Sequence, residues 1–279
     1  MITFQKLGNY GRLGNQLFQY AALKSLSLRK NYQLVLPTNQ FNRLSDFQLR
    51  VHYAPVSSIP VQSIYHESNF SYDENFFNSK DHTSFEGYFQ SEKYFKDISY
   101  IIRREFVLSN NDINNQCLNT INKIRQKHPN QKISGMHIRR GDNVPADTNF
   151  ATADGAQFKT NKEDYHPLLQ KRYIDYCLNE FQNDVKLIFS DSQKDIEWCK
   201  QNLKGENLYF IGGNSDLFDF QIMQYCDNLS ISNSSFSWWS AWLNKNENKR
   251  IIAPYKWFGK AYNQHDLKDL FPNEWEIYK

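Results

Sequence analysis

Two neighbouring arginines lie in a segment whose residue types suit the binding of a diphosphate. The segment is His137–Asp142, and it contains Arg139 and Arg140 followed by Gly141. Two guanidinium groups offer forked, permanently charged donors that match phosphate oxygens in geometry, which the point charge of lysine does not. Gly141 lets the backbone turn closely around an anion, and Asp142 could hold an arginine in place. A surface charge pair is the alternative for the arginines alone, and their position at the expected end of a strand favours the anion site.

A second cluster of small polar residues lies where another strand is expected to pass into a helix. It spans Ser232–Trp239, with four serines among its first six residues, and its candidate binding residues are Asn233, Ser234 and Ser235. Hydroxyl groups and backbone amides at the start of a helix can bind a phosphate, because the amino terminus of a helix carries partial positive charge. An N-cap explains one serine but not all four. The cluster is therefore a second candidate for contact with the diphosphate.

A glycine-containing turn near the start of the chain is a third candidate. Gly11–Gln16 opens the first expected helix and contains Asn15 and Gln16. The turn matches neither the Walker pattern nor Gly-x-Gly-x-x-Gly, so an ordinary nucleotide fingerprint is absent. A tight turn followed by a helix cap explains its glycines equally well.

Polar side chains at two further places give weaker signals. Ser190 and Asp191 follow an expected strand, and Asp219 lies near the start of an expected helix. Carboxylates in such positions could accept hydrogen bonds from a purine base or a ribose. Helix caps and salt bridges are the alternative for each of them.

The pattern of apolar residues predicts the elements that must position these groups. The first half of the chain is expected to hold strands at 2–7 and 33–36, a helix at 15–30, irregular structure up to about residue 110, and a further helix before a turn at 127–130. The second half is expected to hold strands at 132–138, 186–189, 207–211, 229–232 and 250–253, with helices at 167–181, 195–203, 217–225 and 236–244. Ser192 and Asp195 form a capping signature for one of these helices. Strands alternating with helices predict a mainly parallel, doubly wound sheet, in which ligands bind beyond the carboxyl ends of the strands.

Composition excludes several classes of function. The 279 residues include 33 basic and 30 acidic ones, and this balance predicts no nucleic-acid partner. The four cysteines are far apart and form no metal-binding pattern, so we expect reduced thiols and no metal site. No segment approaches the roughly 20 apolar residues that span a bilayer, and no signal peptide is evident. We expect a cytoplasmic protein, with peripheral association at the inner membrane face left open.

Five segments of the chain, taken in order, resemble those of a known family. They are Gly11–Ala21, Gly87–Phe95, His137–Asp142, Phe189–Asp191 and Asn233–Leu243. Together they resemble the bacterial α-1,2-fucosyltransferases, the inverting, GDP-fucose-dependent enzymes of glycosyltransferase family 11, over nearly the whole chain. The resemblance implies an α/β fold of the GT-B type with two Rossmann-like lobes. An acceptor-side lobe is expected at residues 1–130 and a GDP-sugar-binding lobe at 131–279, whose last residues could pack back on the first lobe.

The resemblance also implies a reaction. It is the transfer of L-fucose from GDP-β-L-fucose to the 2-hydroxyl of a galactose or galactose-like residue, with inversion and without a metal. Arg139 and Arg140 would then replace the metal by stabilising the departing GDP. By similarity, His137 and Asp219 would lie near the guanine and ribose, and Asn15 and Gln16 would approach from the other lobe. The chain has no Asp-x-Asp motif, which agrees with the family.

The acceptor hydroxyl must lose a proton, so a general base is expected. Asp147 is the first candidate, because related α-1,6-fucosyltransferases carry a carboxylate at the same spacing behind the arginine motif. Asp142 and His166 are its rivals. The segment 143–166 is longer and more polar than the usual link, and we expect it to order over the acceptor. The alternative is a flexible surface loop.

The identity of the substrates is less constrained than the fold. We expect an oligosaccharide acceptor, with a lipid-linked glycan of O-antigen or surface polysaccharide synthesis as one candidate. The same fold could transfer another GDP-deoxysugar, because the motifs define GDP better than the sugar. A non-catalytic module that binds a sugar nucleotide or a glycan would keep the arginines and need no base.

Overall fold

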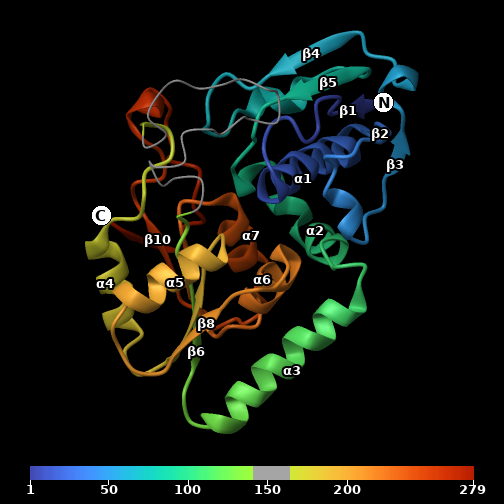
Figure 1. Ribbon diagram of the computed structural model, residues 1–279. Helices are drawn as coiled ribbons and strands as arrows, with labels where there is room; N and C mark the ends of the chain where they lie inside the picture. Colours follow the sequence, from blue (N-terminus) through green and yellow to red (C-terminus); the bar gives the residue numbers. More distant parts are fainter. Residues whose placement is uncertain (141–163) are drawn as a thin grey trace. The chain divides into compact units, whose positions relative to one another are not determined.

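The computed structural model describes residues 1–140 and 164–279 of the chain, which form two compact units. The first unit comprises Met1–Ser109 and Gln264–Asn273. The second comprises 110–140, 164–263 and Glu274–Lys279. Each unit has a parallel sheet of its own (Figure 1).

The first unit is built on a five-stranded parallel sheet in the order β3-β2-β1-β5-β4. Its strands are β1 (Ile2–Thr3), β2 (Leu34–Pro37), β3 (His52–Ala54), β4 (Ser63–His66) and β5 (Thr83–Glu86). Its helices are α1 (Leu13–Lys30) and α2 (Ser99–Glu105), with the 3₁₀ helices η1 (Leu44–Asp46), η2 (Val56–Ser58), η3 (Glu74–Asn78), η4 (Glu92–Tyr94) and η5 (Lys96–Ile98). The sequence predicts irregular structure for the region of β3, β4 and β5. These strands have only three or four residues each, too few for an alternating pattern to stand out.

The segment Gln264–Asn273 joins the first unit through polar and aromatic contacts. The buried carboxylate of Asp269 accepts a hydrogen bond from the backbone N–H of Tyr72 at 3.0 Å and pairs with the ammonium group of Lys93. The ring of His265 stacks on that of Phe70 at 3.9 Å. The chain therefore returns to its first unit after completing most of the second.

The second unit has a six-stranded parallel sheet in the order β11-β10-β9-β6-β7-β8. Its strands are β6 (Ile133–His137), β7 (Val185–Phe189), β8 (Leu208–Ile211), β9 (Asn228–Ser230), β10 (Ile251–Pro254) and β11 (Glu276–Tyr278). Its helices are α3 (Asn111–Lys127), α4 (Lys171–Glu180), α5 (Gln193–Asn202), α6 (Asp216–Met223) and α7 (Ser235–Leu243), with the 3₁₀ helix η8 (Lys260–Tyr262). Numbered along the chain, the strands follow the order 3-2-1-4-5-6 of dinucleotide-binding sheets. The order reverses between β6 and β9, so the loops that follow these two strands meet at the switch point.

Every strand and helix that the sequence predicts beyond residue 131 is present, with shifts at the ends. The prediction for α5 includes its cap, and the Ser192 hydroxyl both accepts from the Asp195 backbone N–H and donates to its carboxylate. Helix α4 begins at Lys171, four residues later than the expected start at 167. Strand β11 has no counterpart in the prediction, because it is a short, half-exposed edge strand.

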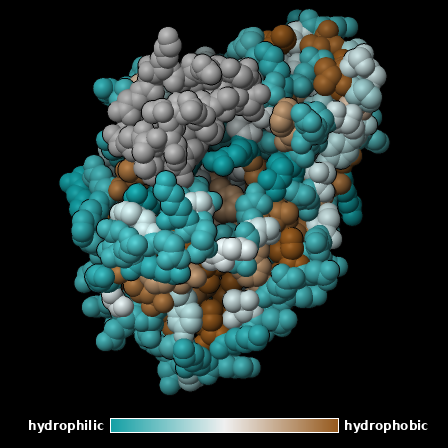
Figure 2. Space-filling model, viewed as in Figure 1, coloured by the Kyte–Doolittle hydropathy of each residue, from teal (hydrophilic) through white to brown (hydrophobic). Residues whose placement is uncertain are grey.

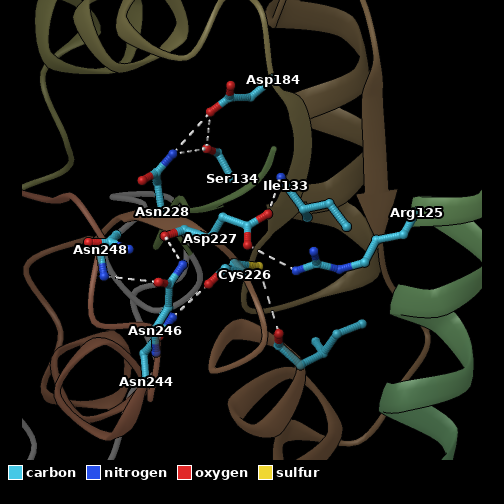
Figure 3. Close-up of polar contacts among 11 residues, drawn as sticks. Arg125, Ile133, Ser134, Asp184, Cys226, Asp227, Asn228, Asn244, Asn246 and Asn248 are labelled. Atoms are coloured by element: carbon cyan, nitrogen blue, oxygen red, sulfur yellow. Dashed lines mark hydrogen bonds and ion pairs between the residues drawn. The ribbon is translucent and has the colours of Figure 1, made fainter. Parts of the chain in front are cut away.

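Helix α3 packs within the second unit, so the units divide before it. The sequence places the lobe boundary after α3, at residue 130. In the structure α3 packs against α6, and the Arg125 guanidinium lies 2.9 Å from the Asp227 carboxylate. Asp227 also accepts from the backbone N–H of Ile133, so one carboxylate ties α3 to the start of β6 (Figure 3). The polar turn at 127–130 separates α3 from β6 inside one unit and does not separate two units.

At the amino-terminal edge of the second sheet, polar side chains form hydrogen bonds with one another and with the backbone. The amide of Asn228 donates to Ser134 and Asp184, and that of Asn246 donates to the Asp227 carbonyl (Figure 3). A shallow pocket of about 380 Å³ lies here, between Arg125, Asp227 and their neighbours. Because ligands of doubly wound sheets bind at the opposite, carboxyl edge, this pocket is not the candidate active site.

On the face shown in Figure 2 hydrophilic residues predominate, with apolar side chains scattered between them. All four cysteines are buried and free. No helix within 1–140 or 164–279 is long and apolar enough to cross a membrane.

Candidate active site

The two clusters expected to bind a diphosphate meet at the switch point of the second sheet. The backbone N–H of Arg139, two residues beyond the end of β6, donates to the Ser232 hydroxyl at 3.2 Å, and Ser232 follows β9. On the other side of this turn, the buried Tyr173 hydroxyl lies 2.7 Å from the Ile231 carbonyl and 2.9 Å from that of Ile252. The tertiary structure thus joins segments that are far apart in sequence.

His137 ends β6 and is buried, with 6% of its surface exposed. Its ring lies 5.8 Å from that of Phe236 in the first turn of α7. Burial lowers the pKa of His137 to about 4, Asp191 opposes that shift, and Arg139 adds to it. The imidazole is therefore neutral at physiological pH. Its Nδ1 atom is buried and has no hydrogen-bond partner among the described residues, so it is available to a ligand.

The two arginines of the motif lie in different surroundings. The Arg140 guanidinium stacks on the Trp198 ring of α5, 3.6 Å from its centroid, and its Nε lies 3.6 Å from the Asp195 carboxylate. Only 17% of the Arg140 side chain is exposed. Arg139 is partly exposed and its backbone bonds Ser232. The sequence alone gives no reason to distinguish the two arginines. In the structure, Arg140 contacts the aromatic ring of Trp198 and the carboxylate of Asp195.

Ser190 and Asp191, which follow β7, support the arginine turn. The Ser190 hydroxyl donates to the Ile138 carbonyl at 2.6 Å, and the Asp191 carboxylate accepts from the Arg140 backbone N–H at 2.8 Å. Both contacts hold the main chain between the end of β6 and the arginines. In this structure the two residues position the turn.

The start of α7 presents amide and hydroxyl groups at the same edge. Ser234 is the N-cap, and its side chain makes no capping bond within the described residues. The first amides of a helix have no partner within the helix, so the first turn that includes Ser235 can receive an anion. Asn233 has a different role, because it is 2% exposed and its amide donates to the carbonyls of Pro167 and Trp257.

Asp219 lies on α6 close to the start of α7, and neighbouring Phe220 packs on Phe236 at 5.4 Å. Burial, with a smaller contribution from Asp216, raises the pKa of Asp219 to about 7. Its Oδ1 is buried and has no hydrogen-bond partner in the described part of the chain. A carboxylate in this state gains from a ligand that donates hydrogen bonds to it.

Asn15 and Gln16 belong to the first unit, where their side chains are engaged. The Gln16 amide donates to the Phe41 carbonyl at 2.9 Å and accepts from the Arg43 backbone N–H at 2.8 Å. The Asn15 side chain accepts from the Gln90 amide at 2.9 Å. Gln16 is 1% exposed and acts within the core of its unit, whereas Asn15 is partly exposed.

The candidates for the general base are only partly covered by the structure. Asp142 and Asp147 lie outside the described residues, as does most of the segment 143–166. His166 is described, and its ring lies 5.6 Å from Phe258 and 6.3 Å from Tyr262. Across 1–140 and 164–279, no group of histidine, cysteine, aspartate or glutamate residues could hold a metal ion.

The arrangement as a whole can receive an anion beside a planar polar group. Permanent positive charge follows β6, helix amides follow β9, and a neutral histidine and a buried carboxylate with unpaired atoms flank them. Ser232, Phe236 and Trp198 contact these groups, although none of the three is predicted from the sequence as a binding residue. Ser232 and Phe236 stood within the serine cluster, but nothing in the sequence pairs Trp198 with Arg140.

Comparison with solved structures supports the two-sheet architecture. The chain resembles the apo form of POFUT1 with a TM-score of 0.51 and 12% identity, over 90% of this chain and 97% of that one. It resembles the fucosyltransferase NodZ from Bradyrhizobium with a TM-score of 0.50 and 12% identity, over 86% and 90% of the two chains. At this identity the likeness shows the fold alone. The fold is that of a GT-B glycosyltransferase with two Rossmann-like units.

Sequence relatives carry related names. The chain is 27% identical to an alpha-1,2-colitosyltransferase of Escherichia coli, with 95% of each chain covered. It is 24% identical to galactoside alpha-(1,2)-fucosyltransferase 2 of Bos taurus, over 84% of this chain and 67% of the relative. It is 29% identical to the O-antigen biosynthesis glycosyltransferase WbnK of Escherichia coli, where the match covers 59% of this chain and 54% of the relative. The model of glycosyl transferase family 11 matches residues 5–279, and the chain therefore belongs to that family of glycosyltransferases.

Proposed function

We propose that this enzyme transfers L-fucose from GDP-β-L-fucose to the 2-hydroxyl of a galactose or galactose-like residue of a glycan, with inversion. The observation that carries the proposal is the meeting of the arginine turn and the serine-rich segment that leads into α7, joined by the hydrogen bond from Arg139 to Ser232. This site offers guanidinium and helix donors together, which suits the diphosphate of a sugar nucleotide. The name of the Bos taurus relative supports fucose, galactoside and the 2-position.

In the proposed reaction the acceptor oxygen attacks C1 of fucose while the bond from C1 to the β-phosphate oxygen breaks. Negative charge then develops on the GDP that departs. Arg139, together with the amides of the first turn of α7, would stabilise that charge more in the transition state than in the ground state. The acceptor proton would pass to a general base, for which the Asp147 carboxylate is our first proposal and Asp142 and His166 are the alternatives.

We assign recognition of the nucleoside to His137 and Asp219, each of which has a buried atom without a hydrogen-bond partner in the described part of the chain. A neutral His137 and the carboxylate of Asp219 would bind the guanine and ribose. The proposal requires no metal, because the guanidinium groups take over the neutralisation of the diphosphate. Chelator should therefore leave transfer unchanged, whereas activity that is lost with chelator and restored by manganese would contradict the metal-free reaction.

The decisive experiment incubates the enzyme with a panel of GDP-sugars and galactose-terminated glycans and determines the linkage of the product. Arg139→Ala should abolish both transfer and donor hydrolysis while the fold stays intact by circular dichroism. Arg172→Ala is the matched control, since Arg172 is an exposed arginine of the same unit bonded to Gln170. Donor binding without turnover on every acceptor, by contrast, would favour a non-catalytic sugar-nucleotide or glycan-binding module.

A second candidate donor should be compared with GDP-fucose in the same assay. The name of the colitosyltransferase relative, which is matched over 95% of its length, supports transfer of another GDP-deoxysugar by this fold. If kcat/KM is higher for GDP-colitose than for GDP-fucose, the donor sugar in our proposal is wrong, and the proposed mechanism still applies. The name of WbnK supports an O-antigen glycan as acceptor. A lipid-linked form of that glycan is part of our proposal. Peripheral membrane association belongs to that part of the proposal and is tested by flotation with vesicles.

A further inference from the structure

A carboxylate of the first unit holds the sharp turn that follows β5. The two oxygens of Glu67 accept hydrogen bonds from the backbone N–H groups of Tyr88 at 2.6 Å and Phe89 at 2.9 Å. Phe89 has a φ of 52° and Gly87 has a φ of 155°, so two residues of this turn have backbone conformations that side chains disfavour. A Cβ on Gly87 would lie 2.4 Å from Cβ of Glu67. The turn and the glutamate therefore fit one another closely.

The same turn is hydrogen-bonded to α1, the helix that begins within the glycine-containing turn Gly11–Gln16. The amide of Gln19 in α1 donates to the Gly87 carbonyl at 3.0 Å and to the Tyr10 carbonyl at 3.2 Å. The amide of Gln90 donates to the Asn15 side chain at 2.9 Å. Gln19 and Gln90 are 0% and 8% exposed, so water does not compete strongly for these bonds. A path of hydrogen bonds and main chain thus leads from Glu67 through the turn to Asn15.

We propose that Glu67 is a positioning residue for the transfer reaction: its carboxylate fixes the Gly87–Gln90 turn, and Gln90 in turn orients the side chain of Asn15. The inference rests on the proposed function and on the role that the family resemblance implies for Asn15, which is to approach the substrates. It also assigns a purpose to the second family-like segment, Gly87–Phe95, which the proposed chemistry does not use. Glu67 itself touches no reacting atom.

The ionisation of Glu67 gives the turn a dependence on pH. Burial raises the pKa of Glu67 to about 7, and the two backbone N–H donors oppose that shift. Above that pH the carboxylate can accept from both amides, and below it one oxygen carries a proton and accepts less well. Tyr65 and Tyr94 interact electrostatically with Glu67. The adjacent residues His66 of β4 and Glu86 of β5 are also titratable, and Glu86 pairs with Lys6 and accepts from the Tyr10 hydroxyl. His66 is retained in a Glu67→Gln variant, so that variant is the reference for the titration of Glu67 alone.

The test compares the full-length enzyme with its Glu67→Gln variant, which keeps the shape but turns one acceptor into an amide donor. We expect kcat for transfer to fall by between about 10- and 100-fold, because small displacements at a reacting site have effects of that size. The affinity for GDP, whose site lies in the other unit, should change less than about twofold. The kcat of the wild type should fall as the pH drops through about 7, and the variant should lack this step.

The control is Glu105→Gln, which removes another buried carboxylate of the first unit, bonded to Tyr20 and Lys24. This variant should have a lower melting temperature, but it should not show a reduced kcat together with an unchanged affinity for GDP. Nuclear magnetic resonance provides the direct readout. The amides of Tyr88 and Phe89 should titrate with Glu67, and the side-chain amide of Asn15 should shift in Glu67→Gln.

Two results would overturn the inference. One is a kcat of Glu67→Gln within about twofold of the wild type. The other is an Asn15 side-chain resonance that does not respond to the substitution. If the enzyme transfers no sugar at all, the proposed function fails, and the resonance of Asn15 still decides whether Glu67 positions it.

Discussion

Coupling between Arg140 and Trp198 is the most discriminating test of the candidate site. Arg140→Lys keeps the charge and can still meet Asp195, but it loses the planar group that lies 3.6 Å from the Trp198 ring centroid. A cation over an aromatic ring contributes about 0.5–1 kcal/mol when exposed and about 2 kcal/mol when desolvated. With 17% of the Arg140 side chain exposed, we expect about 1 kcal/mol, or roughly fivefold in rate.

The assay is a double-mutant cycle on kcat/KM for the sugar nucleotide. Arg140→Lys and Trp198→Leu should each lower kcat/KM, and the double variant should be less impaired than the product of the two, by about fivefold. The coupling is expected whether Arg140 contacts the diphosphate or only holds the turn, because either role needs the guanidinium in place. Thermal unfolding of the four proteins shows how much of each loss is structural.

A control cycle pairs Arg140 with Tyr209 in place of Trp198. Tyr209 is an aromatic residue of the same unit that lies near Lys127 and His128. Arg140→Lys and Tyr209→Leu should combine additively. A coupling between Arg140 and Trp198 within about 0.3 kcal/mol of zero would refute the contact and the inference that α5 orients the arginine.

Three further predictions concern single side chains of the second unit. Because burial lowers the pKa of His137 from 6.5 to about 4, the unfolded state takes up the proton first, and stability should fall by up to about 3 kcal/mol as the pH drops from 6.5 towards 4. Urea titrations at stepped pH measure this loss, and an equally steep loss in His137→Asn would contradict the assignment. The pKa of Asp219 is raised to about 7, so GDP binding by calorimetry should weaken below pH 7 in the wild type, and a similar slope in Asp219→Asn would point to another group. Tyr173→Phe leaves the buried carbonyls of Ile231 and Ile252 without this donor and should cost about 1–3 kcal/mol in urea unfolding, together with weaker GDP binding, since Ile231 precedes the serine turn. Unchanged GDP affinity would show that Tyr173 supports the sheet alone.

Local signals were sufficient for most elements of the second unit. The apolar strand at Ile133–His137 and the capped helix at Gln193–Asn202 follow from short-range patterns, because burial periodicity and capping are properties of neighbouring residues. The same patterns put the arginines and the serine cluster at the ends of strands. Parallel strands bring their carboxyl ends to one edge, so the sequence already predicted a polar crevice there.

Other features depend on which segments pair, and no local pattern encodes that. The strand order puts β6 beside β9, which joins Arg139 to Ser232. Helix α3 belongs to the second unit through Arg125 and Asp227, although a polar turn separates it from β6. The short strands of the first unit carry too few residues to reveal their partners.

The residue types at His137 to Arg140 and Ser232 to Ser235, and the family to which they belong, were determined by the sequence alone. Only the tertiary structure decided that Arg140 lies on Trp198, that Asn233 and Gln16 serve the packing of their own units, and that Glu67 supports the turn beside Asn15. The physical reason is that hydrogen bonds, stacking and desolvation act between atoms within a few ångströms of each other, and separation along the chain does not predict that proximity.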